Sequence, residues 1–137
     1  MSTTPIIQLS ENVFVAGQIQ PGHMSDLAAQ GFKHVICNRP DHEVPGQATM
    51  TEMAEAAQAS DLSFTPYPID ASNFPGEDLG ALTALFDSGE RVLAYCRTGT
   101  RCANLWVASR KDIDRSEAIE VARGIGFDLS LALVWQG

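Results

Sequence analysis

The chain has 137 residues, a net charge of −8, 45% hydrophobic residues and 19% charged residues. This length favours one domain, 1–137, with a proper hydrophobic core. The acidic balance argues against nucleic acid and anionic membranes as partners, because both are bound by dense positive charge. No apolar run approaches the roughly 20 residues of a membrane span. Residues 1–14 lack the basic and apolar regions of a secretion signal, so we expect a cytoplasmic protein.

Apolar runs rich in branched residues alternate along the chain with helical patterns. Strands are predicted at 12–17, 33–38, 62–69 and 91–95. Helices are predicted at 23–31, 47–60, 77–87, 102–110 and 115–126, followed by a short apolar segment at 130–136. This alternation predicts a single-domain α/β fold with a mainly parallel central sheet flanked by helices. The run 91–95 is typical of a buried central strand, because it is apolar on both faces.

The stretch 91-RVLAYCRTGTRCANLW-106 places a cysteine where that strand gives way to a helix. Ligands of open α/β sheets collect beyond the carboxyl ends of the strands. Gly99 permits a sharp turn, and the turn's N–H groups with the helix N-terminus would form an anion site. A thiol there, beside Arg97 or Arg101, should ionise well below the usual pKa of about 8.5. We therefore predict Cys96 as a nucleophile in a substrate-binding loop made of Arg97, Thr98, Gly99 and Thr100.

The chain contains three cysteines, Cys37, Cys96 and Cys102. An odd number in a chain without a secretion signal argues against a disulfide framework. No C-x2-C pair occurs, and the histidines stand far from Cys96 in sequence, so we predict neither a metal nor another cofactor. Cys37, inside the apolar run HVICN, is interpreted as a structural core residue.

The segment YCRTGTRCANLW resembles the active-site loops of two classes of thiolate enzyme. Protein tyrosine and dual-specificity phosphatases carry a cysteine, five intervening residues and an arginine, whereas rhodanese-type sulfurtransferases have a shorter loop. Four residues separate Cys96 from Arg101, and five lead to Cys102. By its length this loop is therefore similar to the rhodanese pattern, with Arg101 as the closing arginine.

The remainder of the chain, through 11-ENVFVAGQIQPGHMSDLAAQGFKHVICNRPDHEVPGQ-47 and 50-MTEMAEAAQASDLSFTPYPI-69, is similar to a bacterial family. It is the beta-lactamase hydrolase-like protein, phosphatase-like domain family, whose members are also classed as sulfur transferases. The resemblance covers nearly the full chain. It implies a dual-specificity-phosphatase-like fold that carries a loop of sulfurtransferase length.

Two positions depart from the phosphatase pattern that the resemblance implies. Tyr95 stands where phosphatases usually have His, and Cys102 stands where a Ser or Thr assists turnover of the phosphoenzyme. A thiol is a weaker hydrogen-bond donor than a hydroxyl. Cys102 is thus either a small residue in the first helical turn or a redox partner that forms a disulfide with Cys96.

Two further loops are expected at the same edge of the sheet. Asp70 follows the strand 62–69 and, by resemblance to dual-specificity phosphatases, is a candidate general acid; a local turn cap is the alternative. In the loop 38-NRPDHE-43, Arg39 is a candidate for binding substrate anions, with Asp41 orienting it through a bidentate pair. A turn built by Asn38, Pro40 and Asp41 explains the same residues locally.

These features support three hypotheses. The first is sulfur transfer, in which Cys96 takes sulfane sulfur from a small anionic donor and passes it from a persulfide to a thiol acceptor. The second is hydrolysis of a phosphoester, in which Cys96 attacks phosphorus, Arg101 binds the oxygens and Asp70 protonates the leaving group. The third is a redox-sensing module in which Cys96 and Cys102 cycle between dithiol and disulfide. The loop length favours the first.

Overall fold

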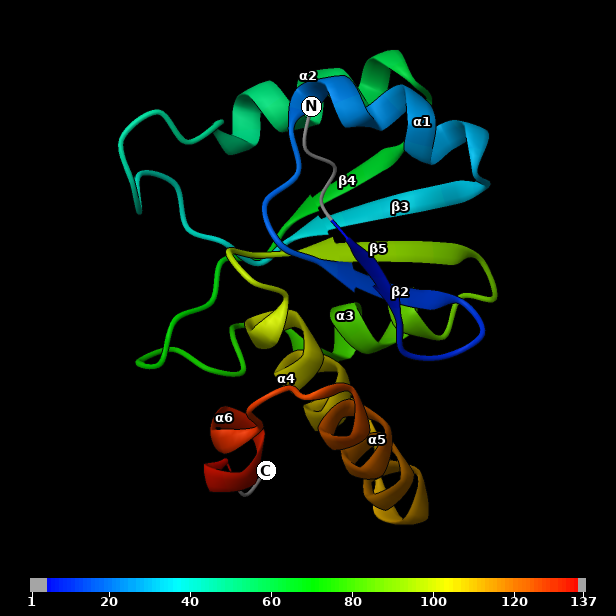
Figure 1. Cartoon of the computed structure of the whole chain (residues 1–137), viewed down its shortest axis with the longest axis vertical. Helices are drawn as coiled ribbons and strands as arrows, with labels where there is room; N and C mark the ends of the chain where they lie inside the picture. Colours follow the sequence, from blue (N-terminus) through cyan, green and yellow to red (C-terminus); the bar gives the residue numbers. More distant parts are fainter. Residues whose placement is uncertain (1–4, 136–137) are drawn as a thin grey trace.

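A five-stranded sheet forms the centre of the structure, a computed structural model in which residues 5–135 are described (Figure 1). The strand order is β1-β2-β5-β3-β4, and all neighbouring strands are parallel except β1 and β2. The strands are β1 (Ile6–Gln8), β2 (Val13–Ala16), β3 (Phe32–Cys37), β4 (Ser63–Pro66) and β5 (Arg91–Tyr95). The predicted α/β fold with a mainly parallel sheet is confirmed, and β5 is its buried central strand.

Helices cover both faces of this sheet (Figure 1). They are the short 3-10 helix η1 (Pro21–His23), α1 (Met24–Ala29), α2 (Met50–Ala59), α3 (Leu79–Phe86), α4 (Thr100–Ala108), α5 (Asp112–Ile125) and α6 (Ser130–Val134). Helices α1 and α2 bury Leu27 and Met53 against one face. The other face is covered by α3 to α6, which contribute Leu82 and Leu105 to a second core. None of the described helices is long and apolar enough to cross a membrane.

The predicted elements are all present, but several of their bounds differ. Strand β4 stops at Pro66 instead of continuing to 69, although the N–H groups of Tyr67 and Ile69 still donate to the carbonyls of Cys37 and Asn38. Helix α4 begins at Thr100, two residues earlier than predicted, because Gly99 is its N-cap. The apolar segment predicted at 130–136 forms α6, and its residue 136 lies outside the described residues. The antiparallel edge strand β1 has three residues, too few for a recognisable pattern.

The side chain of Asn104 ties the start of α4 to the C-terminal part of the fold. It is fully buried, and its Nδ2 donates to the carbonyl oxygens of Thr100 at 2.8 Å and Asp128 at 2.9 Å. Its Oδ1 accepts from the N–H of Ala132 at 2.9 Å. Because Thr100 is the first residue of α4, these bonds hold the helix start that follows the cysteine loop.

Replacing Asn104 with Ala should lower the free energy of unfolding by about 3 kcal/mol, because it leaves buried backbone groups without partners. Urea titration followed by circular dichroism measures this loss. Gln58→Ala, an exposed position on α2, is the control and should change stability by less than about 0.5 kcal/mol. A loss for Asn104→Ala no larger than the control's would contradict the role assigned to these bonds.

Candidate active site

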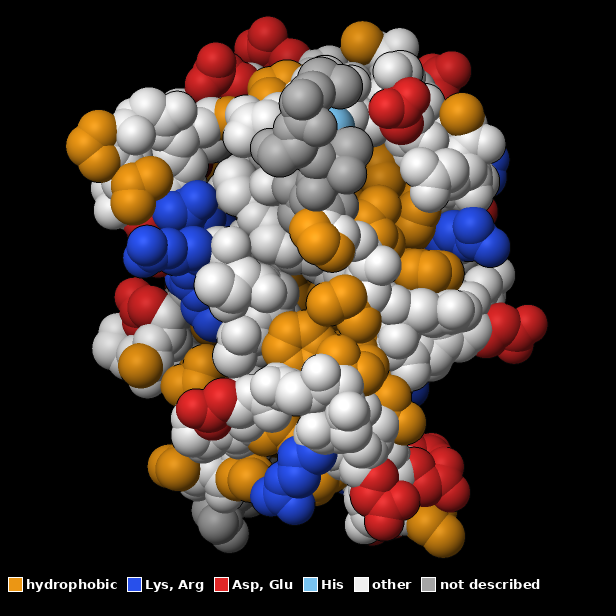
Figure 2. Space-filling model, viewed as in Figure 1, with side chains coloured by type: hydrophobic (Ala, Val, Ile, Leu, Met, Phe, Trp, Pro, Cys, Tyr) orange, Lys and Arg blue, Asp and Glu red, His pale blue; other side chains and the backbone are white. Residues whose placement is uncertain are grey.

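The carboxyl ends of the parallel strands bring four segments together at one edge of the sheet. Gly17 follows β2, Cys96 follows β5, the loop 38–49 follows β3 and the loop 67–78 follows β4. In Figure 2, Lys and Arg side chains gather at this edge, on the left of the view. A chain with a net charge of −8 thus presents a local concentration of positive charge at the place where the predicted site lies.

Cys96 lies at the floor of a tight loop between β5 and α4. Its N–H donates to the carbonyl of Ala16 at 3.2 Å, and its Sγ accepts from the N–H of Gly99 at 3.1 Å. Gly99 has φ +87°, which favours glycine, and this turn directs its N–H toward the sulfur. Cys96 has 0% exposure, so a reactant reaches the sulfur only when groups around the loop move aside.

The environment of Cys96 stabilises its thiolate, as predicted. Its pKa is lowered to about 5, first of all by a hydrogen bond from the Cys102 side chain. Burial opposes this effect, whereas the amides of Cys102, Thr98 and Arg101 lower the pKa further. The sequence predicts a shift caused by amides and guanidinium groups, whereas the leading contribution in the structure comes from the second thiol.

All three thiols gather at this site. Cys102 is fully buried in the first turn of α4, and burial raises its pKa well above the usual value. It therefore stays protonated and donates to the Cys96 sulfur. Cys37, at the end of β3, is also buried and donates to the carbonyl of Arg39 at 3.3 Å. Burial raises the pKa of Cys37 too, so Cys96 is the one thiol in the described residues whose pKa is lowered.

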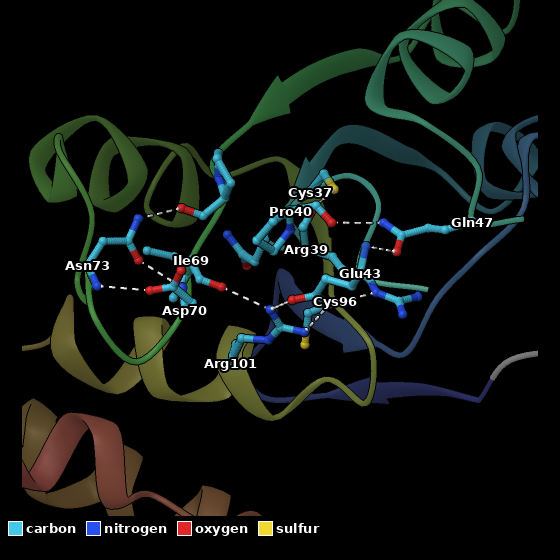
Figure 3. Close-up of polar contacts among 12 residues, drawn as sticks. Cys37, Arg39, Pro40, Glu43, Gln47, Ile69, Asp70, Asn73, Cys96 and Arg101 are labelled. Atoms are coloured by element: carbon cyan, nitrogen blue, oxygen red, sulfur yellow. Dashed lines mark hydrogen bonds and ion pairs between the residues drawn. The ribbon is translucent and has the colours of Figure 1, made fainter. Parts of the chain in front are cut away.

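Arg101 is fixed by the carboxylate of Glu43, which sequence analysis did not single out (Figure 3). Its Nη1 donates to Oε2 of Glu43 at 2.8 Å, and its Nη2 donates to Oε1 at 2.8 Å. Nη1 also donates to the carbonyl of Ile69 at 2.9 Å. These bonds lower the pKa of Glu43 to about 2, with the hydrogen bond from Arg101 as the first cause. The pair therefore stays charged throughout the neutral range.

Arg39 binds the same Glu43 carboxylate as Arg101. Its side chain is 5% exposed, its Nε donates to Oε1 of Glu43 at 2.9 Å, and its Nη1 donates to Oε1 of Gln18 at 3.0 Å. The expected pair of Arg39 with Asp41 is wrong, because Asp41 accepts from the N–H of Met50, the first residue of α2. The i,i+4 spacing of Arg39 and Glu43 was the available signal for the actual partner.

The carboxylate of Asp70 turns into its own loop (Figure 3). Its Oδ1 accepts from the N–H and hydroxyl of Ser72, at 2.8 and 2.6 Å, and from the N–H of Asn73 at 3.1 Å. The Ser72 hydroxyl bond is the first cause that lowers the pKa of Asp70. Asp70 is exposed at the same edge of the sheet as Cys96, and the charge of Arg101 also acts on it. The structure thus contains the turn cap that the sequence analysis gave as the alternative.

The other predicted loop residues differ in exposure. Arg97 and Thr98 are exposed, Thr100 is half-buried, and the Thr98 hydroxyl donates to that of Thr100 at 2.9 Å. Gly17 on the neighbouring strand end was also missed: a Cβ there would lie 2.9 Å from the carbonyl oxygen of Arg97. Glycine at this position therefore lets β2 approach the cysteine loop. The described residues include no group of three or more His, Cys, Asp or Glu placed to hold a metal ion.

A mainly parallel sheet with a thiolate loop after its central strand and an arginine in the next helix defines a phosphatase-like fold. The chain belongs to the family described as beta-lactamase hydrolase-like protein, phosphatase-like domain, whose model matches residues 6–112. The resemblance inferred from the sequence is thereby confirmed.

Known relatives and structures agree with this assignment. The chain is 32% identical to the beta-lactamase hydrolase-like protein of Agrobacterium fabrum, over 94% of the chain and 31% of that protein. It spans less than a third of that curated relative. A candidate phosphatase from Neisseria meningitidis is 30% identical, with a TM-score of 0.73 over 90% of each chain. The structure of P. aeruginosa TpbA in complex with pTyr shares the fold alone, with 14% identity and a TM-score of 0.65 over 95% of this chain and 81% of that one.

Alkylation of Cys96 should follow a titration with a midpoint near pH 5, because its thiolate form is stabilised. From about one pH unit above that midpoint the rate should be constant, whereas free cysteine, with a pKa of about 8.5, is only half thiolate at about pH 8.5 and gains more above it. Cys102→Ala removes the leading hydrogen bond and should move the midpoint upward, while Cys102→Ser retains a donor and should leave it low. Iodoacetamide labelling with peptide mapping measures each site. A midpoint near that of free cysteine would refute the buried thiolate.

Proposed function

We propose that the chain is a cysteine-dependent hydrolase of phosphomonoesters. The observation that carries this proposal is the Cys96 thiolate at the floor of a loop whose amides and arginine favour an anion. The family and the similar structures support a phosphatase-like enzyme. They give no support to sulfur transfer, which the sequence analysis ranked first on loop length. We therefore rank hydrolysis above it.

In this mechanism the phosphoryl group occupies the loop above Cys96. The Cys96 sulfur attacks phosphorus, the bond from phosphorus to the ester oxygen breaks, and the leaving oxygen takes a proton from Asp70 or water. Water then attacks the phosphoryl-cysteine, and inorganic phosphate leaves as the thiolate is restored. The loop amides and the N-terminus of the nine-residue helix α4 stabilise the phosphoryl oxygens in both steps.

Arg101 supplies the binding edge for those oxygens. Glu43 occupies the Nη1 and Nη2 pair, and Ile69 binds the outer Nη1 position. Within the described residues Nε of Arg101 donates no hydrogen bond, so the edge made by Nε and the outer Nη2 position remains for a ligand. A guanidinium edge matches two oxygens of a phosphoryl group. Exposed Arg97 adds charge near the entrance, with Thr98 and Thr100 beside it.

Sulfane-sulfur transfer is the second candidate, and two specific observations favour it. Only four residues separate Cys96 from Arg101, and the Asp70 carboxylate is held ionised in its turn. In this reaction the Cys96 thiolate attacks the outer sulfur of thiosulfate, the S–S bond breaks, and sulfite leaves. An acceptor thiolate then attacks the outer sulfur of the persulfide and releases the Cys96 thiolate. Neither step requires a general acid.

The contact between Cys102 and Cys96 supports a third role, a redox-active pair. Peroxide would oxidise the Cys96 thiolate to a sulfenic acid, and attack by the Cys102 thiol would form a disulfide and release water. Peptide mass spectrometry after mild peroxide treatment should then detect a Cys96–Cys102 crosslink that dithiothreitol reverses. Absence of that crosslink, with Cys96 oxidised further to sulfinic acid, would exclude the redox pair.

The two reactions are separated by the fate of Cys96. With an aryl phosphate, a hydrolase should release inorganic phosphate and pass through a Cys96 adduct of one phosphoryl group. Cys96→Ser should abolish turnover, and Asp70→Asn should slow it by about a hundredfold if Asp70 is the acid. Ser63→Ala, at an exposed position on β4, is the control and should leave turnover unchanged.

The competing outcome is equally specific. Incubation with thiosulfate would add the mass of one sulfur atom to Cys96, a thiol acceptor would remove it, and Asp70→Asn would have no effect. That pattern, together with no release of phosphate from any phosphomonoester tested, would replace hydrolysis by sulfur transfer.

A further inference from the structure

A chain of hydrogen-bonded polar side chains connects three segments next to the cysteine loop. Gln18 follows β2, Arg39 and Glu43 belong to the loop after β3, and Arg101 lies in the first turn of α4. Each member binds the next one: Gln18 accepts from Arg39, Arg39 donates to Glu43, and Glu43 accepts from Arg101. Figure 3 shows Glu43 lying between the two arginines.

The support of Glu43 comes from its own loop as well as from Arg39. Its backbone N–H donates to Oε1 of Gln47 at 3.2 Å, and Nε2 of Gln47 donates to the carbonyl of Pro40 at 2.9 Å. The carboxylate therefore projects from a loop that is closed on itself. With Oε1 shared by Arg39 and Arg101 and Oε2 bound to Arg101, its position is fixed from both sides.

The long side chain of Arg101 gives this support its effect. The arginine is carried by the first turn of α4, and only four residues separate it from Cys96. A guanidinium at the end of a long flexible side chain loses rotamer entropy when it is held in one orientation. The two bonds to Glu43 and the bond to Ile69 fix that orientation before any ligand binds.

We propose that Glu43, supported by Arg39, is a positioning residue that turns the free edge of the Arg101 guanidinium toward the ligand above Cys96. The proposal rests on the proposed role of Arg101 in anion binding and holds for either reaction at Cys96. It assigns buried Arg39 to holding Glu43, in place of the direct substrate contact expected from the sequence.

If Glu43 positions Arg101, replacing Glu43 should weaken anion recognition; if Glu43 acts only through its negative charge, removing that charge should strengthen it. Glu43→Gln removes a negative charge from the site, so charge alone would strengthen attraction of an anion. If Glu43 positions Arg101, the same change loosens the guanidinium and weakens anion recognition, even though the site becomes more positive. Glu43→Asp keeps the charge on a shorter side chain, so only positioning predicts an effect.

The test compares alkylation of Cys96 by iodoacetate, an anion, with alkylation by neutral iodoacetamide. The ratio of the two rate constants reports anion recognition and does not depend on which reaction the enzyme catalyses. We expect Glu43→Gln and Glu43→Asp to lower this ratio roughly tenfold, toward the ratio of Arg101→Lys. That variant keeps the positive charge but lacks the paired N–H donors of a guanidinium. Adding Glu43→Gln to Arg101→Lys should change the ratio no further, because both act through one guanidinium.

Glu55→Gln is the matched control, since it removes an exposed negative charge from α2 and should leave the ratio unchanged. Circular dichroism confirms that each variant is folded. An increased ratio for Glu43→Gln, or an unchanged ratio for Glu43→Asp, would overturn the positioning role. If the wild-type ratio equals that of free glutathione, the anion site itself is refuted, and the proposed function fails with it.

Discussion

A negative charge on a fully buried sulfur is the constraint on which the site depends. Burial alone would raise the pKa of Cys96, as it does for Cys37 and Cys102. The loop reverses that tendency by directing hydrogen-bond donors at one atom, and the strongest comes from Cys102. Gly99, with its left-handed backbone, makes the geometry possible, and α4 starts at once behind it. The bonds of Asn104 then hold that helix start in place.

The site carries a local positive charge although the chain as a whole is acidic, with a net charge of −8. Two arginines and one glutamate form the network beneath the loop, which leaves one positive charge beside the Cys96 thiolate. An unpaired guanidinium would be costly in this half-buried place, and Glu43 offsets that cost while leaving one edge of Arg101 available. The same carboxylate therefore stabilises the charge of Arg101 and leaves one guanidinium edge for the anion that we propose to bind there.

The sequence was sufficient for features that depend on local pattern. Strand β5, the cysteine at its end and the glycine turn all follow from residues adjacent in the chain, and the alternation of elements predicts their parallel order. The pairing of Arg101 with Glu43 spans 58 residues and depends on β3 lying next to β5, which no local pattern reveals. The role of Cys102 was missed for a different reason. A thiol in a first helical turn is usually a small core residue, and only its protonated state beside Cys96 makes it a donor.

Loop length and fold favour different reactions, and the geometry explains why both remain compatible with one site. A thiolate, a set of inward amides and one guanidinium edge suit any attack by sulfur on an anionic centre. What distinguishes phosphate chemistry is the need to protonate an oxygen leaving group and to activate water. Asp70 is the residue that we propose for the first need, yet its Oδ1 accepts three hydrogen bonds from Ser72 and Asn73 that favour the ionised carboxylate. As a general acid Asp70 would have to take up a proton against these bonds, whereas sulfur transfer requires no proton from that loop.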